Sequence, residues 1–143
     1  MRRYGNPPLS HVQYTLRPGA YVILPKGGQL LLTYQSQPEP EVQLPGGGID
    51  PGEGPIQALH REVWEETGWS IAAPRRIGVY RRFVWMPDYD MYAEKLCHVY
   101  LARPVMQLSE PAEPYHSALW MAPEVAVELL GSEGDADLLR QFL

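Results

Sequence analysis

Residues Gly46–Trp69 read GGGIDPGEGPIQALHREVWEETGW, a glycine-rich loop that runs into a segment rich in glutamate. Pro55 suits the first turn of a helix and Gly68 suits its C-terminal stop, so the sequence predicts a helix over Pro55–Thr67. Three apolar residues recur with helical spacing and predict one stripe that faces the core: Ile56, Leu59 and Val63.

Three carboxylates, Glu62, Glu65 and Glu66, fall within one turn of this predicted helix. Positions i, i+3 and i+4 share one helix face, so the three side chains converge. Two like charges 4 Å apart repel by about 4 kcal/mol at an effective dielectric constant of about 20. A divalent cation would supply the counter-charge, and oxygen ligands without His or Cys favour Mg²⁺ or Mn²⁺ over zinc.

Three glycines, Gly46, Gly47 and Gly48, precede the helix by a short loop. Glycine lets a backbone approach closely, so this loop can reach a metal or a phosphate at the positive end of the helix. Arg61 can orient a carboxylate from the same loop, such as Glu53. Taken singly, each feature has a simpler reading, because helical glutamates are usually a solvated face and glycines usually form turns.

The whole frame resembles the Nudix box, in which glycine, glutamate and arginine positions recur at fixed spacing. Seven identities and two apolar positions match without any change in spacing, which leaves chance a negligible explanation. The strands on both sides of the box and the segment Trp120–Glu124 also look like this family. The matched positions are Gly47, Glu53, Arg61, Glu62, Val63, Glu65, Glu66, Gly68 and Trp69.

This resemblance implies an α/β (α+β) fold, the Nudix-type α/β/α sandwich with a central mixed β-sheet. It also implies roles for the box residues. Glu65 and Glu66 would be the main ligands of Mg²⁺ or Mn²⁺, with Glu62 a ligand or the general base and the carbonyl of Gly46 or Gly47 completing the inner sphere. The general base stays open, and Glu53 is either a further ligand or a partner of Arg61. The expected catalytic residues are Glu53, Arg61, Glu62, Glu65 and Glu66, and the expected metal ligands are Gly46, Glu62, Glu65 and Glu66.

Outside the catalytic glutamates, we expect substrate contacts from Gly47, Gly48, His116 and Tyr89. Tyr89 could stack on a base, although aromatic residues of β-rich segments more often pack inside the protein. His116 precedes a strand that lines the substrate pocket in relatives, and an ordinary surface histidine is an equal alternative. The acids in or beside the loop after the predicted strand 76–85 are Asp88, Asp90 and Glu94, each of which is either a substrate or metal contact or a solvated loop acid.

The resemblance implies a metal-dependent enzyme in which activated water cleaves the diphosphate linkage of a nucleoside diphosphate derivative. A nucleoside triphosphate pyrophosphohydrolase is the alternative for the substrate. A catalytically silent nucleotide-binding module is the alternative class, and isomerisation of an isoprenoid diphosphate would need a reactive cysteine. Positions 84–86 carry neither the proline nor the tyrosine that marks two of the family's substrate groups, so the substrate stays open.

The rest of the chain predicts one domain over residues 13–143 behind an N-terminal arm over residues 1–12. Gly27 and Gly28 lie between two apolar runs, a pattern typical of a hairpin. The predicted strands are 20–24, 29–34, 42–44, 76–85, 95–102 and 118–121, and the predicted later helices are 123–130 and 135–142.

Composition adds limits on partners. The net charge is −5, from 12 Lys and Arg against 17 Asp and Glu, and no basic run exceeds a pair such as Arg2-Arg3. We therefore expect no sequence-independent binding to a nucleic-acid backbone. The single cysteine, Cys97, reads as a buried strand thiol. Because no apolar stretch approaches about 20 residues and the start lacks a signal peptide, we expect a cytoplasmic protein without a membrane partner. A homodimer through the arm stays open.

Overall fold

The computed structural model describes residues 1–143, whose strands form two sheets that pack against each other. The larger sheet is mixed and has the order β1-β7-β8-β2-β6. Its strands are β1 (Arg2–Tyr4), β7 (Trp69–Met86), β8 (Met91–Gln107), β2 (Thr15–Ile23) and β6 (Gly46–Gly48). The smaller sheet is antiparallel and consists of β3 (Pro25–Lys26), β4 (Gln29–Gln35), β5 (Glu41–Gln43) and β9 (His116–Met121).

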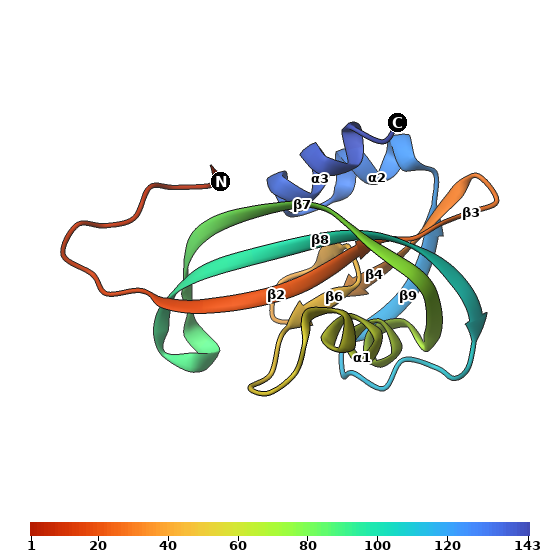
Figure 1. The fold of residues 1–143 in the computed structure, drawn as a ribbon, viewed down its shortest axis with the longest axis horizontal. Helices are drawn as coiled ribbons and strands as arrows, with labels where there is room; N and C mark the ends of the chain where they lie inside the picture. Colours follow the sequence, from red (N-terminus) through yellow and green to blue (C-terminus); the bar gives the residue numbers. More distant parts are fainter.

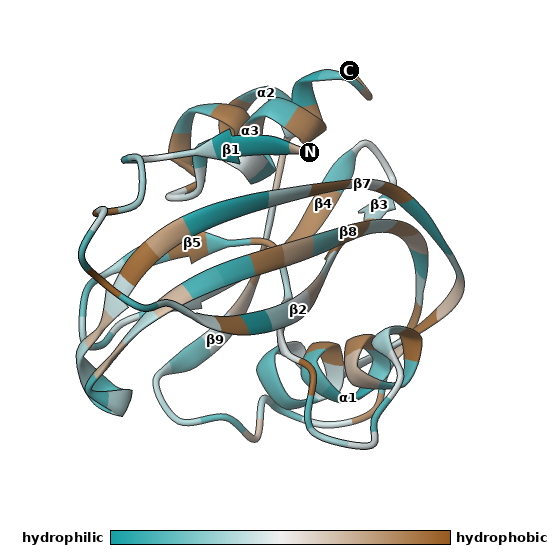
Figure 2. Ribbon diagram, turned by 60° about the vertical axis from the view of Figure 1, so that its left-hand side comes forward, coloured by the Kyte–Doolittle hydropathy of each residue, from teal (hydrophilic) through white to brown (hydrophobic).

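Helices cover both sides of the sheets. Helix α1 (Pro55–Thr67) lies on one side, and α2 (Pro123–Leu129) and α3 (Glu133–Arg140) lie on the other, as Figures 1 and 2 show. A single 3-10 turn, Pro87–Tyr89, joins β7 to β8. The predicted α/β/α sandwich with a central mixed sheet is therefore confirmed. None of the helices is long and apolar enough to cross a membrane.

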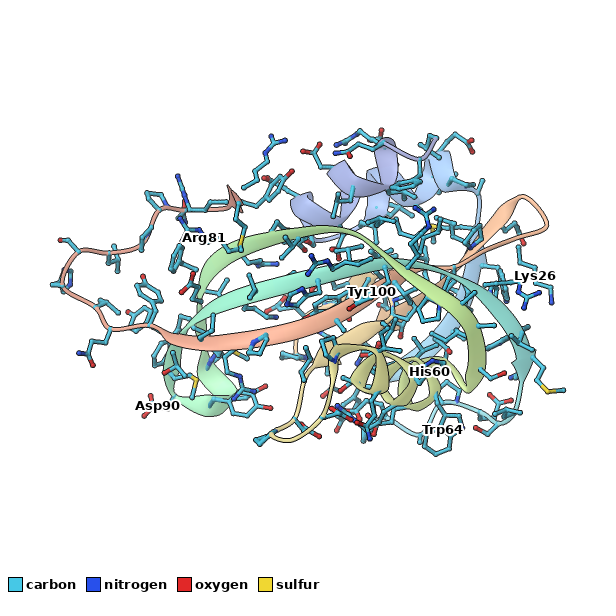
Figure 3. The ribbon with its side chains drawn as sticks, viewed as in Figure 1. Lys26, His60, Trp64, Arg81, Asp90 and Tyr100 are labelled. Carbon is cyan, nitrogen blue, oxygen red and sulfur yellow. The ribbon has the colours of Figure 1, made fainter.

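Helix α1 has the bounds that its sequence signals predict. Pro55 occupies the first turn, and Gly68 ends the helix with a φ of 78°, where its N–H donates to the carbonyl of Trp64. Such a left-handed C-terminal residue favours glycine. Leu59 and Val63 are fully buried, but Ile56 is 45% exposed, so the predicted stripe is wrong at its first position. Trp64 projects away from the sheets (Figure 3).

The predicted hairpin between the first two apolar runs forms only next to its turn, where the N–H of Leu31 donates to the carbonyl of Leu24 at 3.0 Å. Strand β2 pairs with β8 and β6 in the larger sheet, whereas β4 pairs with β3, β5 and β9 in the smaller one. The tight turn joins β3 to β4, and its two glycines, Gly27 and Gly28, have φ values of 59° and 79°. Both apolar runs are buried on both faces, and such a pattern does not specify the partner strand.

The N-terminal arm is partly a strand. Strand β1 adds to the free edge of β7 in parallel register, with Arg2 opposite Tyr80. The hydroxyl of Tyr4 donates to the carboxylate of Asp137 on α3, and the Arg2 guanidinium lies 3.1 Å from the same carboxylate. The proline-containing segment expected to be irregular thus begins only after β1, and β1 covers the edge of the sheet.

Two apolar clusters form the core, one on each side of the larger sheet. The cluster beneath α1 contains Val22, Leu59 and Val63, and the cluster beneath α2 and α3 contains Val99 and Leu139. Alternate residues of β2, β7 and β8 therefore face opposite layers.

Candidate active site

Arg61 joins the carboxylates of the candidate site into one network. Its Nε and Nη2 donate to both oxygens of Glu53, at 2.7 and 2.8 Å. Its Nη1 donates to Glu62 at 2.8 Å and to Glu65 at 3.3 Å. Nη2 also donates to the carbonyl of Gly48 at 2.9 Å. The predicted pairing of Arg61 with Glu53 is thus present, and the planar fork of an arginine suits such bidentate contacts.

Glycines let the loop approach the helix closely. A Cβ on Gly47 would lie 2.6 Å from the carboxylate carbon of Glu62, so this glycine provides the space that Glu62 occupies. The N–H of Gly46 donates to Glu66 at 3.0 Å. The φ of Gly46 is 148°, a value that side chains disfavour, and a Cβ there would collide with backbone atoms of β2. The loop and the acidic face of α1 are therefore fitted to each other.

Electrostatics separate Glu53 from the other acids. The guanidinium of Arg61 lowers the pKa of Glu53 to about 2, so Glu53 is an anion at any physiological pH. Burial raises the pKa of Glu62, despite its hydrogen bond from Arg61. Burial raises the pKa of Glu66 well above its ordinary value, and the nearby acids Glu62 and Glu113 add to this effect. The charged forms of Glu62 and Glu66 are thus disfavoured in the protein alone, and a nearby cation would stabilise them.

His116 lies beside the acidic network. Its Nδ1 lies 2.9 Å from the hydroxyl of Thr33 and 3.7 Å from the carboxylate of Glu66. Burial lowers the pKa of this imidazole, which favours its neutral form. Tyr89 lies elsewhere, at the end of the β7–β8 hairpin, where its ring stacks against the guanidinium of Arg17 at 4.8 Å.

Glu113 is a site residue that the sequence did not single out. The backbone N–H groups of Ala112 and Glu113 both donate to the carbonyl of Glu65, at 2.8 Å. Glu113, His116 and Asp88 line one cleft of about 470 Å³. Asp88 borders this cleft as an exposed side chain, whereas Asp90 lies at the far end of the hairpin in Figure 3. Only the fold brings the loop before β9 to α1, so no local pattern could have identified Glu113.

The donor atoms suit a hard divalent cation, although three of the carboxylates are held by Arg61. Every candidate ligand is a carboxylate or carbonyl oxygen, which Mg²⁺ and Mn²⁺ prefer. Glu66 is a buried carboxyl group whose only hydrogen-bond donor is one backbone N–H. No three His, Cys, Asp or Glu side chains converge on one point in the structure. The residues therefore fit such an ion by donor type and by their unmet charge.

Comparisons with known proteins agree with this geometry. The family model of the NUDIX domain matches residues 14–142. A Bacillus subtilis protein that provisionally carries the name 8-oxo-dGTP diphosphatase is 44% identical over 74 residues, or 52% of this chain and 50% of that protein. An RNA pyrophosphohydrolase of Cereibacter sphaeroides is 36% identical over 98 residues, or 62% of this chain and 59% of that protein. The matches thus span about half to three-fifths of these relatives.

Solved structures share the fold at low sequence identity. A NUDIX hydrolase from Nitrosomonas europaea superposes with a TM-score of 0.73 and 19% identity, covering 90% of this chain and 88% of that one. The MutT protein of Bacillus halodurans gives a TM-score of 0.71 and 21% identity, covering 87% of this chain and 80% of that one. Together with the match of the family model over nearly the whole chain, these likenesses show that the protein belongs to the Nudix family.

Proposed function

We propose that this protein is a Mg²⁺-dependent hydrolase, with Mn²⁺ as a possible substitute, that cleaves the diphosphate linkage of a nucleoside diphosphate derivative. The observation that carries the proposal is the network around Arg61, in which Glu53, Glu62 and Glu65 are all held by one guanidinium. A protein that only bound nucleotides would have no use for such a costly concentration of carboxylates.

The residues of the chain divide the work of hydrolysis. We assign Glu62, Glu65 and Glu66, with the carbonyl of Gly46, to metal binding. When bound, a divalent cation neutralises diphosphate oxygens and lowers the pKa of water. Arg61 fixes the carboxylates, and the glycine loop keeps the backbone close to the phosphates. Water attacks one phosphorus, a carboxylate of the site takes its proton, and the phosphate monoester on the other side leaves.

The names of the relatives provide two substrate candidates within this class. One relative is named for 8-oxo-dGTP and the other for RNA, and both names describe cleavage of a phosphoanhydride. A nucleoside triphosphate pyrophosphohydrolase is therefore the alternative that we keep for the substrate. His116, Gly47 and Gly48 are proposed to contact it, because they border the carboxylate network. Tyr89 is proposed as a contact for more distant parts of the substrate.

Isomerisation of an isoprenoid diphosphate is disfavoured by the state of the only thiol. Cys97 is buried in β8, and burial raises its pKa to about 11. A reactive cysteine needs the opposite shift, because the thiolate is the reactive species. The remaining alternative class is a nucleotide-binding module without catalysis.

The test is a substrate screen of the purified chain with Mg²⁺ or with EDTA. The panel contains nucleoside triphosphates, oxidised nucleotides, ADP-ribose, NADH, diadenosine polyphosphates, nucleotide sugars and 5′-triphosphorylated RNA. We expect metal-dependent turnover that Glu65→Gln abolishes and that Glu128→Gln, an exposed carboxylate of α2, leaves unchanged. Nucleotide binding without turnover would favour the silent module, and full activity of folded Glu65→Gln would contradict the assignment of the site.

A further inference from the structure

Three basic residues lie in one row across the larger sheet. In the strand register Arg17 of β2 is opposite Lys95 of β8, and Lys95 is opposite Arg82 of β7. Residues that are directly opposite on neighbouring strands share a face of the sheet, and the strands are about 4.8 Å apart. We call these three residues the cation row. It lies on the face of the sheet that α2 and α3 cover farther along the strands.

No carboxylate of the protein lies within ion-pair distance of the cation row. Neither Arg17, Arg82 nor Lys95 forms an ion pair or a side-chain hydrogen bond. All three are half-buried. Like charges directly opposite each other destabilise a sheet, so folding alone gives no reason for this arrangement. Unpaired, half-buried cations at fixed spacing are what a binding site for an anion requires.

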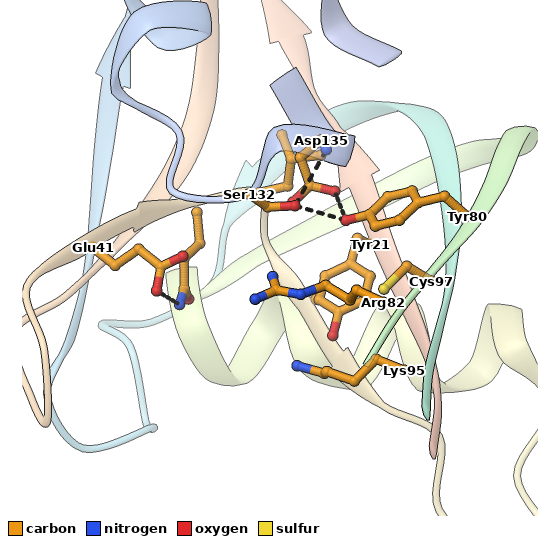
Figure 4. A pocket seen from close by; sticks show the side chains of 11 residues that line it. Tyr21, Glu41, Tyr80, Arg82, Lys95, Cys97, Ser132 and Asp135 are labelled. Carbon is orange, nitrogen blue, oxygen red and sulfur yellow. Dashed lines mark hydrogen bonds between the residues drawn. The ribbon is translucent and has the colours of Figure 1, made fainter. Parts of the chain in front are cut away.

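Two members of the row, Arg82 and Lys95, line a cavity of about 260 Å³. Figure 4 shows Arg82 and Lys95 side by side, with their charged ends in this cavity. Two acids also line it, but each has other partners. The carboxylate of Asp135 accepts the hydroxyl of Tyr80 at 2.7 Å, and Glu41 accepts the amide of Gln43 at 3.3 Å. The cations therefore remain available to a ligand.

The cation row is continuous with the candidate active site. Gly19, two residues after Arg17 on β2, is paired with Gly48 of the glycine loop. The carbonyl of Pro18 accepts the N–H of Ile49 in that loop at 3.0 Å. At the other end, Gly46 lines the cavity with Lys95 and also donates to Glu66. An anion held by the row would thus lie beside the carboxylate network.

We propose that the cation row binds phosphate groups of the substrate beyond the diphosphate linkage that is cleaved. The substrate would then be a nucleotide with a phosphate chain that continues past the cleaved linkage. Such phosphates have two sources, a longer polyphosphate or the phosphodiester backbone of RNA. This proposal rests on the proposed hydrolysis and deepens it, because it requires a substrate whose phosphate chain extends beyond the cleaved linkage.

The first test measures binding of inorganic tripolyphosphate to the full chain in EDTA at low salt. We expect the wild-type protein to bind, with an affinity that falls as salt rises. Arg82→Gln and Lys95→Gln should each weaken binding roughly tenfold, the effect of losing one charge-assisted hydrogen bond. Arg76→Gln is the control, because it removes a charge from an exposed position of β7 whose side chain is hydrogen-bonded only to His98. No wild-type binding, or equal binding by all four proteins, would overturn the proposal.

Stability distinguishes a binding role from a structural one. Removing one of three repelling charges should raise the Tm of the free protein while it weakens tripolyphosphate binding. If Lys95→Gln lowers the Tm and leaves tripolyphosphate binding unchanged, the cation row has a structural role and the proposal is overturned.

Kinetics then identify the source of the phosphates. The substrates are a 5′-triphosphorylated RNA trinucleotide, diadenosine tetraphosphate and ADP-ribose, whose only phosphates form the cleaved pair. Lys95→Gln should raise KM for the first or the second substrate and spare ADP-ribose, and the substrate that responds names the source. An equal rise in KM for all three substrates would contradict the proposed role of the cation row. The protein could prove to cleave none of the substrates while Lys95→Gln still weakens the binding of tripolyphosphate. The proposed hydrolysis would then be wrong, and the proposed phosphate binding by the cation row would remain supported.

Discussion

The two charged regions of the molecule are organised in opposite ways. Around α1, the acids Asp50, Glu53, Glu62 and Glu65 all lie within 4.0 Å of the guanidinium of Arg61. The larger sheet holds nine of the 12 basic residues of a chain whose net charge is −5: two in β1, one in β2, four in β7 and two in β8. Three of these form the cation row, and none of the three has an ion pair within the protein.

This difference indicates that the acidic network positions its side chains, whereas the cation row is free to bind a ligand. Charges that are tied together are held in place, as a catalytic group must be, and they depend on one another. Charges without a partner are ready for an external ligand, and they cost the free protein some stability. Substitutions in the acidic network should therefore reduce turnover and stability together, whereas substitutions in the cation row should weaken binding and improve stability.

Arg61→Gln should have the largest effect, because one guanidinium serves the whole network. We expect kcat to fall by roughly 10²-fold, since misplaced catalytic groups lose rate steeply. The free energy of unfolding should fall by about 2 kcal/mol, less than for a fully buried pair because the Arg61 side chain is 28% exposed.

Chemical denaturation and steady-state kinetics measure both changes. Arg140→Gln is the matched control, because Arg140 pairs with Asp137 at an exposed site of α3 and should cost under about 0.5 kcal/mol. Arg61→Gln with wild-type kcat would break the link between the network and turnover.

Asp135 sharpens the comparison, because it is an acid on the side of the cation row. Burial raises its pKa to about 6 in the folded protein, above the ordinary value of 3.8. The folded state then binds the proton more tightly than the unfolded state, so stability falls as pH rises from about 4 to about 6 and stays lower above that. A shift of about two units corresponds to at most about 3 kcal/mol.

Asp135→Asn removes this titration and keeps an acceptor for the Tyr80 hydroxyl. Unfolding of both proteins by denaturant from pH 4 to pH 7 gives the difference in stability. We expect the wild type to lose stability relative to Asp135→Asn as pH rises through 6. A constant difference over this range would show that Asp135 titrates normally.

Gly47→Ala tests the fit between the glycine loop and α1. The added Cβ would lie 2.6 Å from the Glu62 carboxylate, so this flexible side chain must move. We expect kcat to fall roughly tenfold with little change in Tm. Gly48→Ala is a close control, because nothing lies within 4 Å of a Cβ at Gly48. Equal kcat values for the two variants would mean that the position of Glu62 does not limit turnover.

Lys95→Gln should change stability only slightly, and in the opposite direction to Arg61→Gln. Relief of cross-strand repulsion should stabilise the free protein by about 0.2–1 kcal/mol. Denaturant unfolding at low salt measures the gain, and added salt should reduce it because salt screens the repulsion. Destabilisation of the same size would mean that Lys95 contributes packing that outweighs its charge.

The features predicted correctly from the sequence are those with local causes. Helix α1 follows from Pro55, Gly68 and the apolar spacing between them, all within one segment. The pairing of Arg61 with Glu53 follows from the box, which contains both residues. The layered architecture follows from the family resemblance and from strands on both sides of a central helix.

The features that were missed depend on partners far away in the chain. The apolar runs around Gly27 and Gly28 do not specify that β2 joins β8 while β4 joins β9. No run of basic residues is longer than a pair, and the cation row exists only because strand register aligns three separate positions. Glu113 likewise reaches the site through tertiary hydrogen bonds to the carbonyl of Glu65.

The most direct test of the account is the kcat and KM of Glu66→Gln and Lys95→Gln, measured side by side on the best substrate of the screen that carries phosphates beyond the cleaved linkage. Glu66→Gln should lower kcat by roughly 10²- to 10³-fold with little change in KM, because it removes charge that acts in the transition state. Lys95→Gln should raise KM roughly tenfold and leave kcat unchanged. Turnover by folded Glu66→Gln close to that of the wild type would contradict the assignment of the acidic network as the catalytic site.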